Sequence, residues 1–225
     1  MDLGAPAEAS SVAVVDRTLR GVGEPFNHRV ERDGTRVVTA VEEVEVVYEV
    51  RHLRRFSPPY RYGGVARHTA EVVAELGEAL VGVDVTRTGR PTFSTIRNAV
   101  RKEVFGDRTT FFPVTISWSG AGVTHGTSGF VVPRRDLVFL SVELFESQRL
   151  KIAKGMELSG VLVEEYMTFK PARDPKDDLE GWRLGRNDDL VLATSLACWI
   201  SESYVKRTKT RPVGVSRVEK ERVPF

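Results

Sequence analysis

Three aspartates lie where a strand is expected to end or a helix to begin. Asp84 follows the apolar run 80–83 and precedes a glycine-containing turn, while Asp188 and Asp189 open an apolar stretch. α/β sheets bind ligands beyond the carboxyl ends of their strands. A carboxylate there is costly to bury unless it is paired or binds a cation. These aspartates are therefore candidate cation ligands.

Helix capping is an alternative explanation for the second pair. An acid at a helix N-terminus accepts free N–H groups and suits the helix dipole. Capping by Asn187 or Asp188 explains Asp188 well, but it explains Asp189 less well because one cap needs one acid. Among the other acids, Asp16 directly follows the apolar run 12–15, so spacing alone favours Asp16 as an aspartate at the end of a strand. Composition alone places Asp2 in a frayed chain end.

The composition limits the class of protein. The 225 residues are 41% hydrophobic and 28% charged, which is typical of a globular chain. The single cysteine, Cys198, excludes an intramolecular disulfide and a thiolate metal cluster. The four histidines have no ligand spacing, which argues against zinc. No apolar run is long enough to span a membrane and no signal pattern opens the chain, so we expect a cytoplasmic protein.

The charge is divided unevenly. Residues 205–225 hold seven Lys and Arg against two Glu, a net charge of +5, whereas the whole chain carries +2, so residues 1–204 carry −3. We expect one domain over 1–204 and a basic tail over 205–225. A basic tail can bind a polyanion such as a nucleic acid, but the same cluster of basic residues is equally typical of a solvated chain end.

The hydrophobic pattern predicts an α/β fold with a mixed sheet, whose early strands are antiparallel and whose later strands are parallel. Residues 20–36, rich in glycine and charge, are expected to be a connection with an irregular hairpin. The expected strands are 11–19, 44–56, 80–85, 111–118 and 149–153, and the expected helices are 65–76, one starting near Pro91, 133–147, 157–169 and 188–205.

Four segments of the chain together resemble one family. Residues 185–193 (GRNDDLVLA) resemble the third acidic motif, H-D-D-L-V-x-A, of phage terminase large-subunit nucleases, with Asn187 in place of the histidine. Residues 81–91 (VGVDVTRTGRP) resemble the D-A-T-G-V-G-R-P segment of that family. Arg87 stands in place of a glycine of that segment, and glycine adopts a positive φ more easily than arginine does. Residues 132–138 and 149–153 are similar to its middle helix and strand. The resemblance runs from residue 1 to about residue 204.

The resemblance implies a ribonuclease H-like mixed sheet with antiparallel first strands and flanking helices. Asp2, within Asp2-Leu3-Gly4, then matches the first acidic motif, and this places Asp2 rather than Asp16 in the site. Asp2, Asp84 and Asp189 are the expected catalytic residues, and with Asp188 they are the expected ligands of two Mg²⁺ or Mn²⁺ ions. Two such ions hydrolyse phosphodiester bonds by orienting water and stabilising the leaving oxygen.

The resemblance also implies partners. Double-stranded DNA is the expected substrate during genome packaging, with Arg134, Arg135 and Lys151 as candidate phosphate contacts. The chain has no G-x-x-x-x-G-K-[ST] segment, so a separate packaging ATPase is an expected partner, together with a portal protein or a small terminase subunit. No membrane partner is expected.

Two other functions stay open. Because only Met1 and Asp2 precede the first turn, either the chain start lies a few residues too late, or the chain is a decaying prophage remnant, or a short first strand suffices. A remnant would be a non-catalytic DNA-binding or assembly module that keeps the fold. A structure-specific resolvase of the same fold is the third possibility.

Overall fold

The computed structural model describes residues 1–5, 7–32, 35–104, 108–118, 121–127, 129–169, 188–207 and 219–220. Two sheets form the body. The first has the order β1 (Ser10–Arg32), β2 (Thr35–Phe56), β7 (Leu150–Ile152), and β8 (Glu219–Lys220) also pairs with β2. The second has the order β3 (Ala79–Asp84), β4 (Thr109–Ser117), β6 (Gly129–Pro133), β5 (Thr124–Gly126).

The first residues of the chain join the two sheets. Asp2 and Ser11 exchange two backbone hydrogen bonds, of 2.9 and 2.8 Å. On the other side, the Met1 nitrogen donates to the Gly82 carbonyl at 2.9 Å, and the Asp84 N–H donates to the Met1 carbonyl at 3.0 Å. Residues 1 and 2 therefore act as a short strand between β1 and β3, which places Asp2 beside Asp84.

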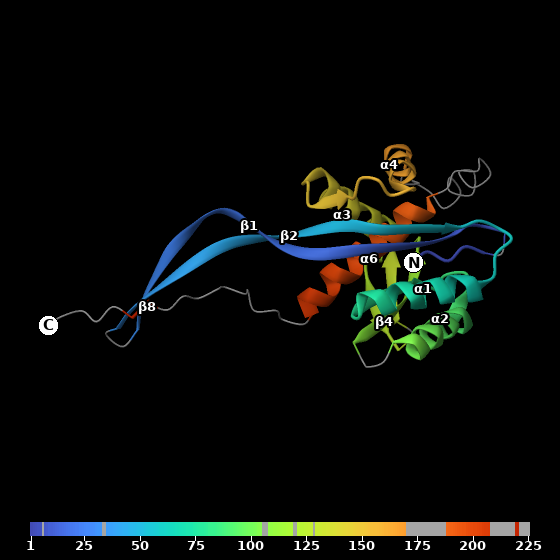
Figure 1. Cartoon of the computed structure of the whole chain (residues 1–225), viewed down its shortest axis with the longest axis horizontal. Helices are drawn as coiled ribbons and strands as arrows, with labels where there is room; N and C mark the ends of the chain where they lie inside the picture. The colour runs from blue at the N-terminus through green and yellow to red at the C-terminus, as the bar shows by residue number, and fades with distance from the viewer. Residues whose placement is uncertain are drawn as a thin grey trace.

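Helices cover both faces of this sheet layer (Figure 1). The helices α1 (Tyr62–Leu76) and α2 (Gly89–Glu103) share a core cluster with β3 and the N-terminal residues. The helices α3 (Arg134–Glu146), α4 (Ser159–Thr168) and α6 (Asp189–Arg207) share clusters with strands of both sheets. Between Asp189 and Ile200, α6 is buried almost continuously, which explains its near-uniform apolar sequence.

The mixed α/β architecture is confirmed. The strands β1 and β2 pair antiparallel, β2 and β7 pair parallel, and β3, β4 and β6 are parallel. Most of the expected helices and strands lie within a few residues of those observed. The sequence interpretation missed the short strands β5, β6 and β8, and α6 ends at Arg207, past the expected boundary at 204. Residues 170–187, with the candidate cap Asn187, lie outside the described chain.

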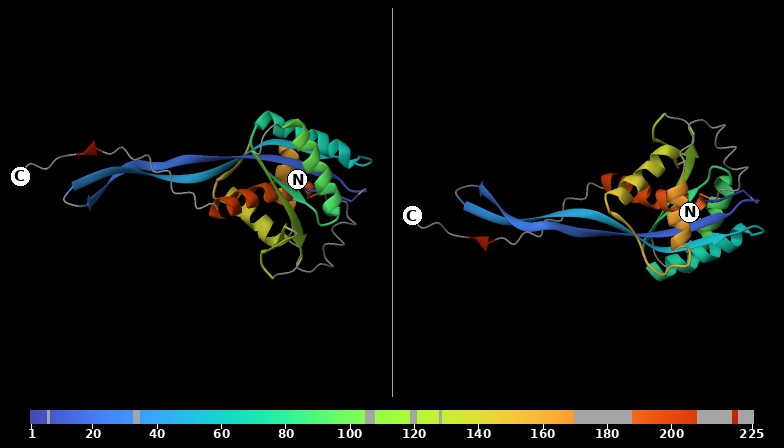
Figure 2. Two further views of the ribbon diagram at one scale, coloured as in Figure 1. Left: turned by 90° about the horizontal axis from the view of Figure 1, so that it is seen from below. Right: turned by 90° about the horizontal axis from the view of Figure 1, so that it is seen from above.

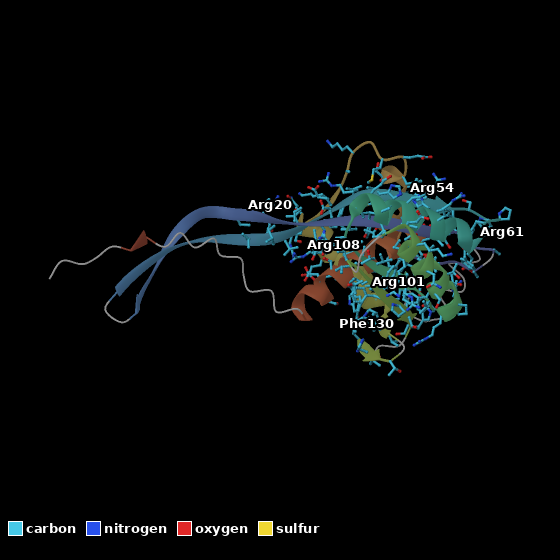
Figure 3. All side chains as sticks on the ribbon, turned by 60° about the horizontal axis from the view of Figure 1, so that its bottom comes forward. Arg20, Arg54, Arg61, Arg101, Arg108 and Phe130 are labelled. Carbon is cyan, nitrogen blue, oxygen red and sulfur yellow. The ribbon has the colours of Figure 1, made fainter. Side chains whose placement is uncertain are left out.

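One expectation is met only in part. The irregular hairpin expected within residues 20–36 is present, but β1 continues to Arg32 and β2 begins at Thr35, so most of this segment is paired strand and not a connection. The two strands form a long arm that projects from the body, and all views agree on this shape (Figures 1 and 2). Arg20 lies where the arm leaves the body, and it pairs with Glu45 across the two strands (Figure 3). The register is irregular between Val22 and Phe26, where Pro25 interrupts the pairing.

Candidate active site

Four aspartates from three separate segments line one cavity of about 380 Å³. Asp2 comes from the N-terminal residues, Asp84 from the end of β3, and Asp188 and Asp189 from the start of α6. Asp84 and Asp189 are buried, at 6% exposure each. Asp16, the acid favoured by spacing alone, is exposed on β1 opposite Glu49 and does not line the cavity.

Asp2 and Asp84 interact directly. Their carboxyl groups are hydrogen-bonded to each other, and burial together with the negative charges of Asp84, Asp189 and Asp188 raises the pKa of Asp2 well above its usual range. Burial also raises the pKa of Asp84, although hydrogen bonds from the Thr86 side chain and backbone and from Asp2 oppose the shift. Like charges this close to each other disfavour the ionised forms of both carboxyl groups.

Thr86 fixes the orientation of Asp84. The Thr86 N–H donates to Asp84 Oδ1 at 2.8 Å, and the Thr86 hydroxyl donates to the same oxygen. The Thr86 Oγ1 in turn accepts the Ile116 N–H of β4 at 2.7 Å. The neighbouring Arg87 is not strained, because Gln148 is the one non-glycine residue with positive φ in the described chain. The Arg87 side chain forms an ion pair with Glu8.

Two arginines face the aspartates of α6. Arg55, at the end of β2, donates from Nε to Asp189 Oδ2 at 2.9 Å and from Nη2 to Glu165. Ser11 also donates to Asp189 Oδ2. Arg134, the first residue of α3, pairs with Asp188 and lies over the Trp118 ring at 4.7 Å. Both guanidinium groups therefore place positive charge at the edge of the cavity.

A residue outside the expected capping pair contacts the start of α6. Glu165 of α4 accepts the N–H groups of Leu190 and Val191 at 3.1 and 3.3 Å, so it caps the first turn of the helix. Burial and the charge of Asp189 raise the pKa of Glu165 to about 7, against the opposing effect of Arg55. The Asp188 and Asp189 side chains line the cavity, where Arg134 and Arg55 pair with them.

The residues fit a divalent cation chemically. Carboxylate oxygens are the ligands that hard cations prefer, and Asp189 Oδ1 is buried with no hydrogen-bond partner within the described chain. A cation beside Asp2 and Asp84 would also relieve the repulsion that raises the pKa of Asp2. Among the described residues, no three Asp, Glu, His or Cys side chains are arranged around one ion. Arg55 and Arg134 contact the two helix aspartates in this arrangement.

The candidate DNA contacts are placed differently. Arg134 lines the cavity, whereas Arg135 is exposed beside Phe139 and Lys151 lies on β7 opposite Glu49; neither lines the cavity. The sequence interpretation missed the site roles of Arg55 and Glu165. Glu165 carried a signal, since it lies three residues after Leu162 on the apolar face of α4, where a carboxylate is unexpected.

The chain is similar in structure to a viral terminase nuclease domain. A human cytomegalovirus terminase nuclease domain, soaked with manganese and bound to an inhibitor, matches 87% of this chain and 83% of its own, with a TM-score of 0.50 and 12% identity. The chain has the fold of a terminase nuclease domain. The expected fold class and the likeness to a terminase nuclease domain are thus confirmed at the level of the fold.

Two other structures of that viral domain also match, each at 13% identity. The manganese-soaked form covers 88% of this chain and 87% of its own with a TM-score of 0.44, and a third form covers 96% and 92% with a TM-score of 0.48. No protein-family model and no curated protein matches the sequence. Within the described chain, no helix combines the length and apolar composition that a membrane span needs.

Proposed function

We propose that the chain is a divalent-metal-dependent endonuclease that hydrolyses phosphodiester bonds in double-stranded DNA. The observation that carries the proposal is the convergence of Asp2, Asp84, Asp188 and Asp189 on one cavity of the terminase-nuclease fold. The manganese soaked into the viral domain of the same fold supports the choice of metal. Genome packaging, with a separate ATPase, portal protein or small terminase subunit as partner, is the biological role we propose.

The aspartates would hold the cations. Asp2, Asp84 and Asp189 would be the principal ligands of two Mg²⁺ or Mn²⁺ ions, with Asp188 as a further ligand. The bound ions would supply the charge that activates water and stabilises the leaving oxygen. For the ions to bind, Asp2 and Asp84 would both have to be ionised, and Arg55 would have to give up its hydrogen bond to Asp189.

The arginines at the cavity would orient the substrate. Arg55, Arg87 and Arg134 all line it, and guanidinium groups match phosphate geometry with paired donors. Arg134 is held over the Trp118 ring, which limits the motion of its side chain. Arg135 and Lys151 would contact DNA phosphates outside the cavity. Such contacts carry no sequence information, so we expect little sequence preference.

Plasmid nicking tests this function. The wild-type chain should convert supercoiled plasmid to nicked and linear forms with Mn²⁺ and not with EDTA. The variant Asp84→Asn should lose this activity, whereas the matched control Asp16→Asn, which changes an exposed aspartate outside the cavity, should keep it. Absence of metal-dependent nicking by the wild-type chain, or equal nicking by Asp84→Asn, contradicts the proposal.

A second candidate function is a non-catalytic DNA-binding or assembly module. The ion pairs of Arg55 with Asp189 and of Arg134 with Asp188 favour it, because they neutralise the helix aspartates without a metal. Calorimetric titration with Mn²⁺ separates the two functions. Binding that Asp84→Asn abolishes supports the nuclease, and an absence of binding supports the module.

A further inference from the structure

The outer edge of β2 is only partly covered by strands. β1 pairs with the inner edge of β2 from one end to the other. On the outer edge, β7 pairs at Tyr48–Val50 and β8 pairs at Val37 and Val38. β8 must lie on the outer edge, since β1 already pairs with Val37 and Val38. Within the described chain, residues 39–47 of this edge have no strand partner.

The register of β8 identifies a segment that matches this gap. Val38 faces Glu219 and Val37 faces Lys220 in an antiparallel pair. Each step forward along β2 therefore corresponds to one step back along the tail. If this register continues, residue 218 faces residue 39 and residue 210 faces residue 47, next to the position where β7 begins to pair. The nine residues 210–218 thus match the nine residues 39–47.

The tail also starts and ends in the right places. Tyr48 donates its hydroxyl hydrogen to Glu202 Oε1 at 2.6 Å, so the last turns of α6 lie beside the point of β2 where the gap begins. From Arg207 to Glu219 there are twelve peptide steps, which reach about 40 Å when extended. The ten steps of β2 from Tyr48 to Val38 span about 33 Å. The tail is therefore long enough to follow the edge in an extended form.

The charges of the two segments are complementary. Residues 39–47 (TAVEEVEVV) contain three glutamates and no basic residue, while residues 208–218 (TKTRPVGVSRV) contain three basic residues and no acid. The tail segment also holds three valines, which favour strands. Pro212 is compatible with an outermost strand, where every second N–H group points to solvent.

We propose that residues 210–218 form an outer strand, antiparallel to residues 39–47 of β2, so that the basic tail docks on the arm of its own chain. An uncovered edge of this length exposes a row of unpaired N–H and C=O groups that can pair with other chains. The tail would satisfy these groups. Its positive charge then serves the glutamates of β2 rather than DNA.

Cysteine cross-linking in the full-length chain tests the register. The pairs Ser216→Cys with Val41→Cys and Val215→Cys with Glu42→Cys are adjacent in the expected ladder. One of them is therefore a non-hydrogen-bonded pair, whose side chains lie closest together. Mild oxidation should form an intramolecular disulfide in at least one pair, detected by a mass loss of about 2 Da under non-reducing conditions. The native Cys198 is buried, so its thiol should remain reduced under mild oxidation.

The control pair for cross-linking is Ser216→Cys with Val44→Cys, which is three residues out of register. Equal cross-linking of the control pair overturns the proposal. So does cross-linking only between two chains, which would assign the edge to the tail of a second copy. An absence of any disulfide in both in-register pairs also overturns it.

Hydrogen exchange provides a second measurement that needs no cysteine. Amides of residues 39–47 should exchange at least about tenfold faster in the variant Lys209→Glu/Arg211→Glu/Arg217→Glu than in the wild-type chain, because the strand is lost. The control Lys209→Arg/Arg211→Lys/Arg217→Lys should exchange like the wild type. If all three proteins exchange alike while the charge reversal weakens binding to duplex DNA, the tail serves DNA and the proposal fails.

Discussion

The Arg55 guanidinium donates from Nε to Asp189 Oδ2 at 2.9 Å, although the two residues are 134 positions apart in sequence. The Arg55 side chain is 16% exposed, and it also pairs with Glu165. A single guanidinium therefore balances two buried carboxylates, one at the candidate metal site and one that caps α6. This contact connects the end of β2, the start of α6 and the middle of α4.

Replacing this guanidinium should destabilise the fold. In Arg55→Ala, Asp189 and Glu165 lose their buried counter-charge, so the free energy of unfolding in EDTA should fall by about 3 kcal/mol. Mn²⁺ should recover part of this loss, because a cation near Asp189 takes over the role of the guanidinium. Urea unfolding with and without Mn²⁺ measures both effects.

The matched control is Arg51→Ala. Arg51 pairs with Glu49 at the surface, and its side chain is 55% exposed, so its loss should change the free energy of unfolding by less than about 1 kcal/mol. Equal stabilities of the Arg55 and Arg51 variants would show that Arg55 does not balance the buried acids.

The raised pKa of Glu165 predicts a pH-dependent stability. Its pKa rises from an ordinary 4.5 to about 7, so between these values the native chain holds a proton that the unfolded chain has released. The free energy of unfolding should therefore fall as the pH rises from about 4.5 to about 7, by on the order of 3 kcal/mol, and level off above. Glu165→Gln should lack this contribution. Urea unfolding at pH 5, 6 and 7.5 measures the difference from the wild type.

The exposed neighbour provides the control for this measurement. Glu164→Gln changes the adjacent residue on the solvent side of α4 and should leave the pH profile as in the wild type. If the wild-type and Glu165→Gln profiles are parallel, Glu165 does not take up a proton in the native chain over this range.

Local sequence patterns predicted the body of the fold but not the length of the arm. The helix periodicity of 65–76 and the apolar run 80–85 closely match α1 and β3, because a local pattern determines which face is buried. Gly21, Gly23 and Pro25 suggested a connection. The long-range pairing of β1 with β2 overrides them, and a register shift between Val22 and Phe26 accommodates the proline.

The site could be predicted only as far as its acids. Asp84 and Asp189 follow from their places beside a strand and a helix, whereas the choice of Asp2 over Asp16 needed the resemblance to a family. The contacts of Arg55 and Glu165 depend on how β2, α4 and α6 pack together, and the sequence spacing does not encode that packing. Charged residues that balance a site from distant segments are therefore the least predictable part of it.

Thr86→Val should weaken both the fold and metal binding. The Thr86 hydroxyl accepts the Ile116 N–H and donates to Asp84, so its removal leaves a backbone donor without its partner and costs about 1–3 kcal/mol. The same hydroxyl lowers the pKa of Asp84, so the pKa should rise further in the variant. Because a higher pKa makes protons compete more strongly with Mn²⁺ for Asp84, calorimetry should show a larger loss of affinity at pH 6 than at pH 8.

Two threonine variants check this prediction. Thr86→Ser keeps the hydroxyl and should bind Mn²⁺ nearly as the wild type does. Thr95→Val removes a hydroxyl that bonds only the Pro91 carbonyl on the exposed side of α2, and it should be nearly neutral. If the loss of Mn²⁺ affinity in Thr86→Val relative to the wild type is the same at pH 6 as at pH 8, Thr86 does not have the proposed positioning role.

Gly4→Ala should impair the site by moving Asp2. A Cβ atom on Gly4 would lie 2.1 Å from the Ala9 carbonyl oxygen, so the backbone itself must shift. The Gly4 N–H donates to Ser10 Oγ at 3.0 Å and its carbonyl accepts from Tyr62, and both bonds hold the segment that carries Asp2. We expect a loss of about 1–3 kcal/mol in the free energy of unfolding, together with weaker Mn²⁺ binding.

Gly63→Ala separates this steric effect from the general effect of replacing a glycine. Gly63 lies in α1, and an added Cβ would meet nothing within 4 Å, so the variant should be more stable by about 0.5–1 kcal/mol and should bind Mn²⁺ like the wild type. If Gly4→Ala unfolds and binds Mn²⁺ as Gly63→Ala does, the N-terminal segment tolerates the shift and does not fix the position of Asp2. The opposite result would show that the close approach of Gly4 to Ala9 holds the first aspartate at the cavity.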